Sequence, residues 1–401
     1  MKNLIKSFNQ INMQSLAEVG GKNASLGEMY QKLNPKGIRV PDGFALTATA
    51  YRNFLRENNL TSLLSRLMNE LDTEGFTNLS SIGQQARAAI LRHRFNAATQ
   101  AAIKAAYREL MQKEGSEISL AVRSSATAED LPTASFAGQQ ESYLNIKGTQ
   151  QLLDACLHCY ASLFTDRAIK YRVDQGFDHM QVALSVGVQQ MVRSDMASSG
   201  VIFTLDPESG FRDVVIINSA YGLGELIVKG KVDPDEFVVY KPALANNKKS
   251  ILSKKMGTKQ ETLVYQQSTD PQQVAAFNTT TQLVDTPFGK SNAFSLNDSE
   301  IETLARWSVQ IEKHYALPMD IEWAKDGVSN KLFIVQARPE TVHSNTEGLA
   351  FIQYQLLDEA PVLVSGCGLG NKITAGRAVV LNSPEEAHKL QQGDVLVTDI
   401  T

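Results

Sequence analysis

The sequence predicts an α+β protein, because helix-like and strand-like patterns occupy separate stretches of the chain. Residues 47–115 repeat Ala, Leu, Arg, Gln and Glu at spacings of three and four, interrupted at Thr73-Glu74-Gly75, which indicates a helical subdomain. Strand patterns follow at 118–123, 182–188 and 214–217, with a helical stretch at 151–171 between them. A mixed α and β region is therefore expected in the middle of the chain.

A hairpin is predicted late in the chain. Residues 319–323 and 332–338 alternate apolar and polar side chains on either side of Asp326-Gly327, a turn sequence. Further on, Thr341 to Gly348 are small and polar, which marks a linker and a boundary near 345. We expect a first domain at 1–345 and a second region at 346–401.

The second region resembles the start of a βαβ unit. Strands are predicted at 375–381 and 395–398, and Ser383-Pro384-Glu385-Glu386 between them has the signature of a helix start. Few residues remain after 398 to cover the apolar faces of such a unit. We therefore expect an incomplete domain here.

Composition excludes several classes of protein. The 401 residues are 43% hydrophobic and 20% charged, and 39 Lys and Arg face 43 Asp and Glu. The net charge of −4 provides no broad positive field for nucleic acid or anionic lipid. No run approaches the roughly 20 apolar residues of a membrane-spanning helix. Three cysteines are too few for a disulfide framework, so a reducing, cytoplasmic location is expected.

The first candidate site is Gly20-Gly21-Lys22, which precedes a helical pattern. A helix that begins near Lys22 would offer free N–H groups and a mobile positive charge to a phosphate. The motif is not a Walker A loop, because Leu16 and Asn23 occupy positions that require Gly and Ser or Thr. A plain turn before a surface helix remains the alternative.

The second candidate begins at Arg123, at the end of a predicted strand. Ser124 and Ser125 follow it, and Ser135-Phe136-Ala137-Gly138-Gln139-Gln140 forms a second small-residue segment a little later. Such loops present amides and one guanidinium fork to a phosphate chain. Two ordinary surface turns beside a solvated arginine are the equally weighted alternative.

The third candidate depends on side-chain parity in the late hairpin. Asp320 and Glu322 share one face of a strand, and Gln336 and Arg338 share one face of its partner. If Glu322 stands opposite Gln336, these four polar groups converge, while Ile321, Trp323, Val335 and Ala337 occupy the other face. Two carboxylates, an amide and an arginine suit a magnesium–triphosphate complex. A solvated face with weak ion pairs is the alternative.

Other features carry less weight. Gly222-Leu223-Gly224 lacks the third glycine of a dinucleotide fingerprint, since Ile227 stands there. Cys156-Leu157-His158-Cys159 lies in a helical pattern and lacks a second ligand pair, so helix residues are favoured over zinc. A solvated hairpin or loop is expected to carry the lysines of 248–259, which are Lys248, Lys249, Lys254, Lys255 and Lys259.

Several of these segments resemble the phosphoenolpyruvate synthase family, the pyruvate, water dikinases. The resemblance covers about residue 8 to the last residue, in the order of the family. The segments that carry it are Gly20 to Glu28 with Pro41-Asp42-Gly43-Phe44, Val122 to Asp130, Ser135 to Gln139, Pro318 to Ala324, and Gln336 to Thr341.

The resemblance implies an ATP-grasp nucleotide domain with a helical subdomain, followed by the start of a swivelling phosphohistidine domain. Lys22, Arg123 and Arg338 would hold phosphates, with Lys22 and Arg338 as catalytic residues, and Ser124, Ser125 and Gly138 would form the phosphate loop. Glu322 and Gln336, with Asp320 as a weaker candidate, would bind Mg²⁺. Gln189-Gln190-Met191-Val192 resembles the hinge beside adenine, which makes Gln189 and Met191 ATP-binding residues.

In that family ATP, pyruvate and water become AMP, phosphoenolpyruvate and phosphate through a phosphohistidine. The acceptor histidine motif and the pyruvate-binding barrel are not found in these 401 residues, so we expect this chain to bind MgATP without completing the reaction. Homodimerisation through C-terminal domains would fit the family. The alternatives are a related dikinase with another acceptor, such as rifampin phosphotransferase or pyruvate, phosphate dikinase, and a non-catalytic nucleotide-binding module.

Overall fold

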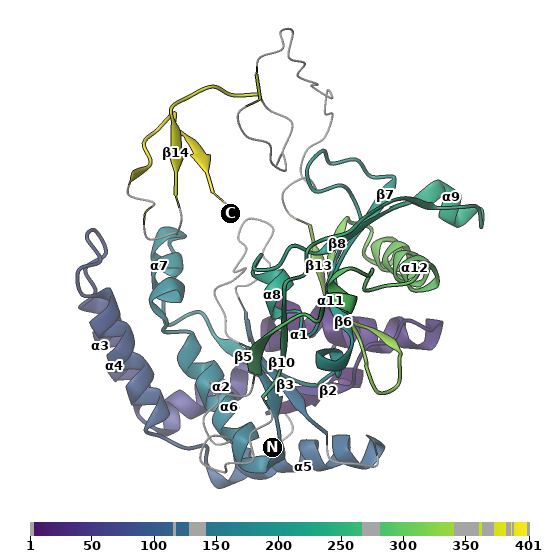
Figure 1. The fold of residues 1–401 in the computed structure, drawn as a ribbon. Helices are drawn as coiled ribbons and strands as arrows, with labels where there is room; N and C mark the ends of the chain where they lie inside the picture. Colours follow the sequence, from purple (N-terminus) through teal and green to yellow (C-terminus); the bar gives the residue numbers. More distant parts are fainter. Residues whose placement is uncertain are drawn as a thin grey trace.

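The computed structural model contains two antiparallel sheets joined by one helix (Figure 1). It describes residues 4–114, 118–127, 142–266, 281–340, 361–362, 373–381, 386 and 389–398. The mixed α and β content that the sequence predicts is confirmed. The candidate residues at 341–348 and at 128–141, Gly138 among them, lie outside the described residues.

The first sheet has five strands in the order β1-β2-β5-β3-β4. Their bounds are β1 Ile5–Ser7, β2 Gly43–Leu46, β3 Leu120–Ala126, β4 Ser142–Ile146 and β5 Leu184–Gln190. β3 pairs with β5 without a break from Leu120↔Gln190 to Ala126↔Leu184, so each residue of β3 faces the same side of the sheet as its partner on β5, and the side alternates along the strand. One side of this sheet carries a core cluster that includes Val122, Val186 and Val188.

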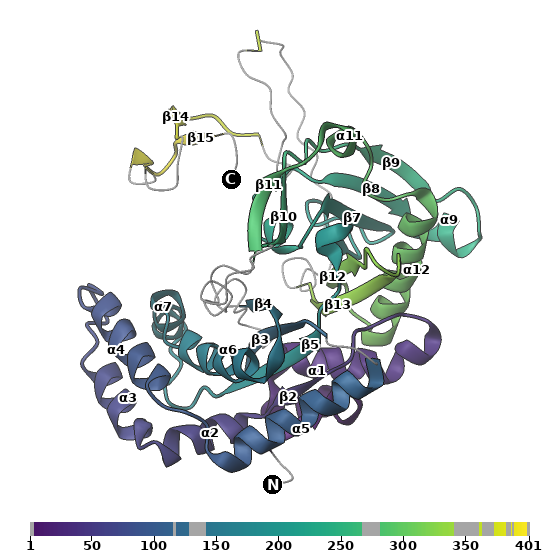
Figure 2. The same cartoon turned by 60° about the horizontal axis from the view of Figure 1, so that its bottom comes forward.

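Three helices pack directly on that side of the first sheet, and three more pack against these helices beside it (Figure 2). The first three are α2 Ala48–Glu57, α5 Ala97–Glu114 and α6 Gly148–Ser162, and the others are α3 Leu60–Asn69, α4 Leu79–Leu91 and α7 Asp166–Asp174. The predicted helical subdomain is confirmed, and its break at 73–75 is a turn in which the Asp72 carboxylate accepts hydrogen bonds from the amides of Glu74, Gly75 and Thr77. The predicted helical stretch at 151–171 is divided into α6 and α7. Cys156 and Cys159 both lie buried on α6.

The second sheet has six strands in the order β13-β12-β6-β7-β8-β9. Their bounds are β6 Ser198–Phe203, β7 Val214–Tyr221, β8 Asp235–Tyr240, β9 Ile251–Lys255, β12 Met319–Lys325 and β13 Leu332–Pro339. Helix α12, Asp298–Tyr315, begins at an Asn297–Glu300 capping box and packs into the core cluster on one side of this sheet. That cluster contains Ile217, Phe237 and Ile321.

Helix α1, Leu16–Lys32, packs against both sheets. Its Asn23 Nδ2 donates to Ser185 Oγ of β5 at 3.0 Å, and its Ser25 Oγ donates to the carbonyl of Ala337 on β13 at 2.7 Å. Because both bonds are buried, α1 fixes the ends of the two sheets against one helix.

Smaller elements complete the described structure. A two-stranded antiparallel sheet pairs β10 Glu261–Tyr265 with β11 Thr281–Asp285. The parallel pair predicted near the C-terminus is present as β14 Ala378–Val380 and β15 Val395–Val397, and the predicted helix start at 383–385 lies outside the described residues. The short helices are η1 Phe8–Gln10, η2 Met13–Ser15, η3 Asn34–Lys36, η4 Ser194–Met196, α8 Glu225–Val228, α9 Lys241–Ala245 and α11 Phe288–Ser291.

The prediction of a solvated lysine segment is wrong for one residue. Lys259 and Asp235 are both fully buried and form an ion pair, and Asp235 also accepts from the Gly257 amide and from Ser295. Lys248, Lys249, Lys254 and Lys255 are exposed as predicted. A buried lysine requires a specific partner, and Asp235 is 24 residues away, so spacing alone could not reveal the pair.

None of the described helices combines the length and the apolar character that crossing a membrane requires.

Candidate functional site

The late hairpin has the register on which the predicted site depends. Glu322 pairs with Gln336 and Asp320 pairs with Arg338 across β12 and β13. Ile321 and Ala337 belong to the core cluster under the opposite face. The four polar side chains therefore share one face of the six-stranded sheet.

A β-bulge changes the apolar face of this hairpin. The register shifts after Glu322, so that Trp323 pairs with Ile334 instead of Val335. Ile334 is fully buried in the core, whereas Val335 is only half-buried. We expected Val335 on the apolar face with Trp323 and Ala337. The bulge inserts one extra residue, so that Ile334 takes this place opposite Trp323.

Asp320 and Arg338 form an ion pair on the polar face. The Arg338 Nε and Nη2 atoms lie 2.8 and 2.7 Å from Asp320 Oδ2. Burial raises the pKa of the Asp320 carboxyl, although the Arg338 charge and hydrogen bond act in the opposite direction. Asp320 therefore orients the guanidinium of Arg338.

Arg123, on β3 of the first sheet, lies close to the polar face of this hairpin. Its Nη1 atom lies 3.6 Å from Glu322 Oε2 and 3.5 Å from Gln336 Oε1. Both distances are long for hydrogen bonds, so Arg123 is close to the two side chains without being tightly bound by either. Its Nε atom is buried and has no hydrogen bond to another described residue. Three predicted site residues from two sheets thus meet.

Ser124 and Ser125 lie within β3, so the predicted phosphate loop is wrong at these positions. Alternation directs Ser125 to the same side as Arg123, whereas Ser124 faces the apolar core between Val122 and Ala126 and is 1% exposed. Strand pairing with β5 continues through both residues. Ser124 is therefore separated from the Arg123 side of the sheet.

Gly20 allows the segment before Lys22 to approach β3 closely. Its φ of +73° interrupts α1, and a Cβ built there would lie 2.3 Å from Ser125 Oγ. Helical geometry resumes directly afterwards, which confirms the predicted helix start near Lys22. Lys22 is half-buried in the first turn after Gly20, one turn before Ser25 contacts β13.

The two predicted hinge residues differ in their environments. Gln189 lies inside the first sheet, pairs with Gly43 and Ala121, and is 3% exposed. Its Nε2 atom has no hydrogen bond to a described residue. Met191 follows β5 and packs against a small apolar cluster that contains Leu223, Leu226 of α8 and Leu263 of β10.

The residues present fit magnesium that arrives with phosphate better than magnesium bound by protein alone. In the described ranges no three His, Cys, Asp or Glu residues are grouped closely enough to hold a metal ion. Glu322 and Gln336 offer one carboxylate and one amide oxygen, and Asp320 is engaged by Arg338. Mg²⁺ commonly uses one or two protein ligands and completes its shell with water and phosphate.

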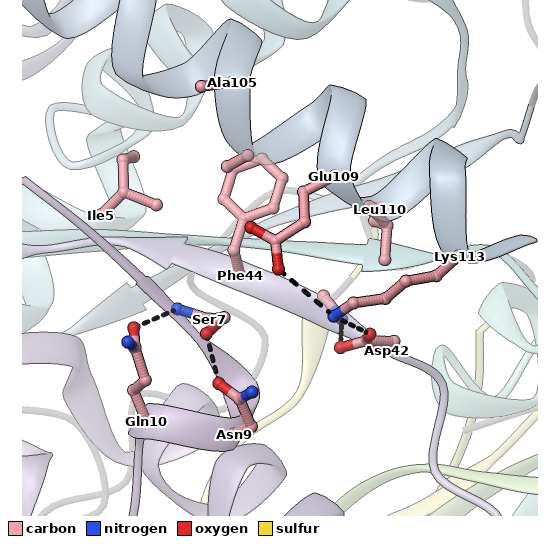
Figure 3. Close-up of a pocket in the computed structure, with 12 residues that line it drawn as sticks. Ile5, Ser7, Asn9, Gln10, Asp42, Phe44, Ala105, Glu109, Leu110 and Lys113 are labelled. Atoms are coloured by element: carbon pink, nitrogen blue, oxygen red, sulfur yellow. Dashed lines mark hydrogen bonds and ion pairs between the residues drawn. The ribbon is translucent and has the colours of Figure 1, made fainter.

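A pocket of about 300 Å³ lies away from these residues, between α5, β2 and the segment that contains Ser7 and Gln10 (Figure 3). At its wall the Lys113 ammonium donates to Asp42 Oδ2 at 3.0 Å and lies 3.6 Å from Glu109. None of the predicted site residues lines this pocket.

Sequence reasoning missed two polar residues on the face of the second sheet. Glu322 pairs with Val201 on β6, Val201 pairs with Asn218 on β7, and Asn218 pairs with Glu236 on β8. These residues form one row across four strands. Asn218 ends the apolar run 214–217, and only the register between distant strands connects it with Glu322.

Comparison with known families decides what kind of domain carries this site. Residues 16–355 match the family described as pyruvate phosphate dikinase, AMP/ATP-binding domain. The chain belongs to this family. The match includes all the candidate residues named above, from Lys22 to Arg338.

This dikinase-family chain is also similar to curated proteins named phosphoenolpyruvate synthase. It is 47% identical over 412 residues to the one from Aquifex aeolicus and 48% identical over 398 residues to the one from Escherichia coli, covering 100% and 99% of this chain. A probable phosphoenolpyruvate synthase from Methanocaldococcus jannaschii is 38% identical over 383 residues. The chain spans 47% and 49% of the first two relatives, or about half their length, and 30% of the third.

Proposed function

We propose that this chain is the ATP-binding part of a phosphoenolpyruvate synthase and that it binds MgATP between its two sheets in an ATP-grasp arrangement. The observation that carries this proposal is the approach of Arg123 to Glu322 and Gln336, beside the Asp320–Arg338 pair. Cationic groups and hard oxygen ligands from two sheets converge there. A triphosphate with Mg²⁺ requires this combination.

Each residue has a distinct role in this proposal. Arg123, Arg338 and Lys22 hold phosphate oxygens, and Asp320 keeps the Arg338 fork oriented. Glu322 and Gln336 hold Mg²⁺, which would neutralise phosphate charge when bound. Phosphoryl transfer depends mainly on positioning and charge stabilisation, so these groups suit it without a covalent role for this domain.

The base end of ATP would lie beside Gln189 and Met191. Met191 packs against the apolar cluster of Leu223, Leu226 and Leu263, which provides apolar surface for a purine. The unpartnered Gln189 Nε2 could donate to a ring nitrogen. Ser125 remains a candidate for a phosphate contact, and Ser124 does not.

In the whole protein, ATP, pyruvate and water would be converted to AMP, phosphoenolpyruvate and phosphate in the cytoplasm. Residues 1–345 would form the nucleotide domain, and residues 346–401 would begin the phosphohistidine domain. Relatives named phosphoenolpyruvate synthase at up to 48% identity favour pyruvate over other acceptors. Homodimerisation would involve other domains.

Calorimetric titration with ATP and with AMP, both in the presence of Mg²⁺, tests this proposal. We expect saturable ATP binding. Arg338→Ala should weaken the binding of ATP by about 1–3 kcal/mol more than the binding of AMP, because a charge-assisted contact to the outer phosphates is lost. Arg66→Ala is the control. Arg66 is an exposed arginine whose one ion pair, with Glu70 at 3.9 Å, is long and weak.

Removal of Arg338 also leaves the half-buried Asp320 without its cation. The double variant Arg338→Ala/Asp320→Asn removes that charge and should show the same preferential loss of ATP in a stably folded chain. Equal losses for ATP and AMP, or no ATP binding by the folded wild-type chain, would contradict the proposed site.

A further inference from the structure

The row of side chains that begins at Glu322 continues for two more polar positions. β-strands in a sheet are about 4.8 Å apart, so Asn218 lies about 10 Å from Glu322 across the sheet, and Glu236 lies one strand beyond it. Their neighbours Ile217 and Phe237 are buried in the core on the other side. Asn218 and Glu236 therefore share the face that carries Glu322 and Gln336.

Both side chains have hydrogen-bonding capacity that the described structure does not use. The Asn218 Oδ1 atom is shielded from solvent and accepts no hydrogen bond from a described residue. The half-buried Glu236 carboxylate likewise forms no ion pair or hydrogen bond with the part of the chain that is described. An unpaired acceptor as shielded as Asn218 Oδ1 is costly, which indicates that a ligand or water supplies its donor, and the Glu236 carboxylate beside it is open to the same ligand.

The position of these acceptors relates them to the nucleotide. The Met191 cluster lies just beyond the end of β7, since Leu223 is two residues after Tyr221, and Glu322 lies two strands to the side of Asn218. A nucleotide with its base at Met191 and its phosphates at Glu322 and Arg123 would bring its sugar to the middle of β7. This is where Asn218 lies, with Glu236 beside it.

The side chains of Asn218 and Glu236 suit a ligand with hydroxyl donors better than a phosphate or a metal ion. A phosphate would be repelled by the Glu236 carboxylate. A metal ion would find too few ligands, since no three His, Cys, Asp or Glu residues in the described part of the chain are grouped closely enough to hold one. A diol has no charge, and each of its hydroxyls donates one hydrogen bond to a carboxylate or amide oxygen.

We propose that Asn218 and Glu236 bind the ribose hydroxyls of the nucleotide and make the site selective for ribonucleotides. The inference rests on the proposed function, because it requires ATP to lie along this face. Neither residue would take part in phosphoryl transfer.

Competition binding of ATP, 2′-deoxy-ATP and 3′-deoxy-ATP with Mg²⁺ tests the proposal. We expect the wild-type chain to bind ATP about tenfold more tightly than at least one deoxy analogue, because a hydrogen bond to a carboxylate is lost. Glu236→Gln should reduce this preference to about threefold or less, and Glu236→Ala should abolish it. Neither should weaken the deoxy analogue itself by more than about twofold.

Glu74→Gln is the matched control, because it removes the same charge at an exposed turn of the helical subdomain. It should leave the tenfold preference unchanged, and thermal melts should show that the Glu236 variants remain folded. Equal weakening of ATP and both analogues in Glu236→Gln, or a shift only in the Mg²⁺ requirement, would overturn the proposal. Failure of the wild-type chain to bind any of the three nucleotides would instead refute the proposed function.

Discussion

Gly20 packs so closely against Ser125 that any side chain at residue 20 would collide with β3. The nearest atoms to a Cβ at this position are Ser125 Oγ at 2.3 Å and the carbonyl oxygens of Ser125 and Ala126 at 2.8 Å. Two of these atoms belong to the backbone of a paired strand and cannot move away cheaply. The contact holds the segment before Lys22 against the end of β3.

We therefore expect Gly20→Ala to be much more destabilising than Gly37→Ala. Both glycines have positive φ values. Gly37 is in the left-handed helical region, where alanine incurs about 1–2 kcal/mol of strain, whereas Gly20, with φ 73° and ψ 168°, is in a region that is essentially confined to glycine and costs about 1–3 kcal/mol. No atom lies within 4 Å of a Cβ at Gly37, whereas Gly20→Ala also collides with β3. Urea unfolding should show a difference of at least about 2 kcal/mol. Equal losses would mean that the loop moves away from β3 without cost.

The buried Lys259–Asp235 pair predicts a second large effect. Lys259→Met leaves the Asp235 carboxylate buried without its cation, and we expect a loss of about 3–5 kcal/mol in the free energy of unfolding. The double variant Lys259→Met/Asp235→Asn should lose less than Lys259→Met alone, because the uncompensated charge is removed.

Lys249→Met provides the control for this prediction, since Lys249 is an exposed member of the same lysine-rich segment. It should change stability by less than about 0.5 kcal/mol. A double variant that is as unstable as Lys259→Met would show that packing, and not the unpaired charge, is responsible.

His179 predicts how stability depends on pH. Arg172 Nε donates to His179 Nδ1 at 2.9 Å, and burial, followed by the Arg172 charge, lowers the pKa of His179 to about 4. The unfolded histidine has a pKa of about 6.5 and binds a proton more readily. The stability from this contact is therefore present above about pH 6.5 and is lost as pH falls toward 4.

His179→Gln should remove this component, because glutamine can accept the Arg172 bond but does not titrate. Because His179 is only partly buried, the expected effect is small. Between pH 7.5 and pH 5, urea titrations should show that the free energy of unfolding falls by about 1 kcal/mol more in the wild-type chain than in the variant. Parallel losses in the two proteins would mean that His179 does not control this range.

Most of the secondary structure could be predicted from the sequence, because it follows from local periodicity. The helical subdomain, β3, β5, β7 and the β12–β13 hairpin appear where apolar spacing indicated them. Parity on two neighbouring strands was also sufficient to bring Asp320, Glu322, Gln336 and Arg338 onto one face, since a hairpin fixes its own register. Glycine before Lys22 indicated the start of a helix.

Contacts between distant segments could not be predicted in the same way. Three findings each depend on which strand lies next to which. They are the bulge that places Ile334 opposite Trp323, the core-facing side of Ser124, and the burial of Lys259 with Asp235. The row from Glu322 to Asn218 and Glu236 requires the order β12-β6-β7-β8, in which β12 comes from a different part of the chain from the other three strands.

The sequence by itself therefore determined the elements and the chemistry that they carry, because periodicity, capping and short-range register act within a few residues. Tertiary structure decided which of these groups meet. Helix α1 contacts both sheets, and Arg123 of one sheet reaches Glu322 and Gln336 of the other. Such meetings depend on the packing of two cores around a shared helix, and no local pattern encodes that arrangement.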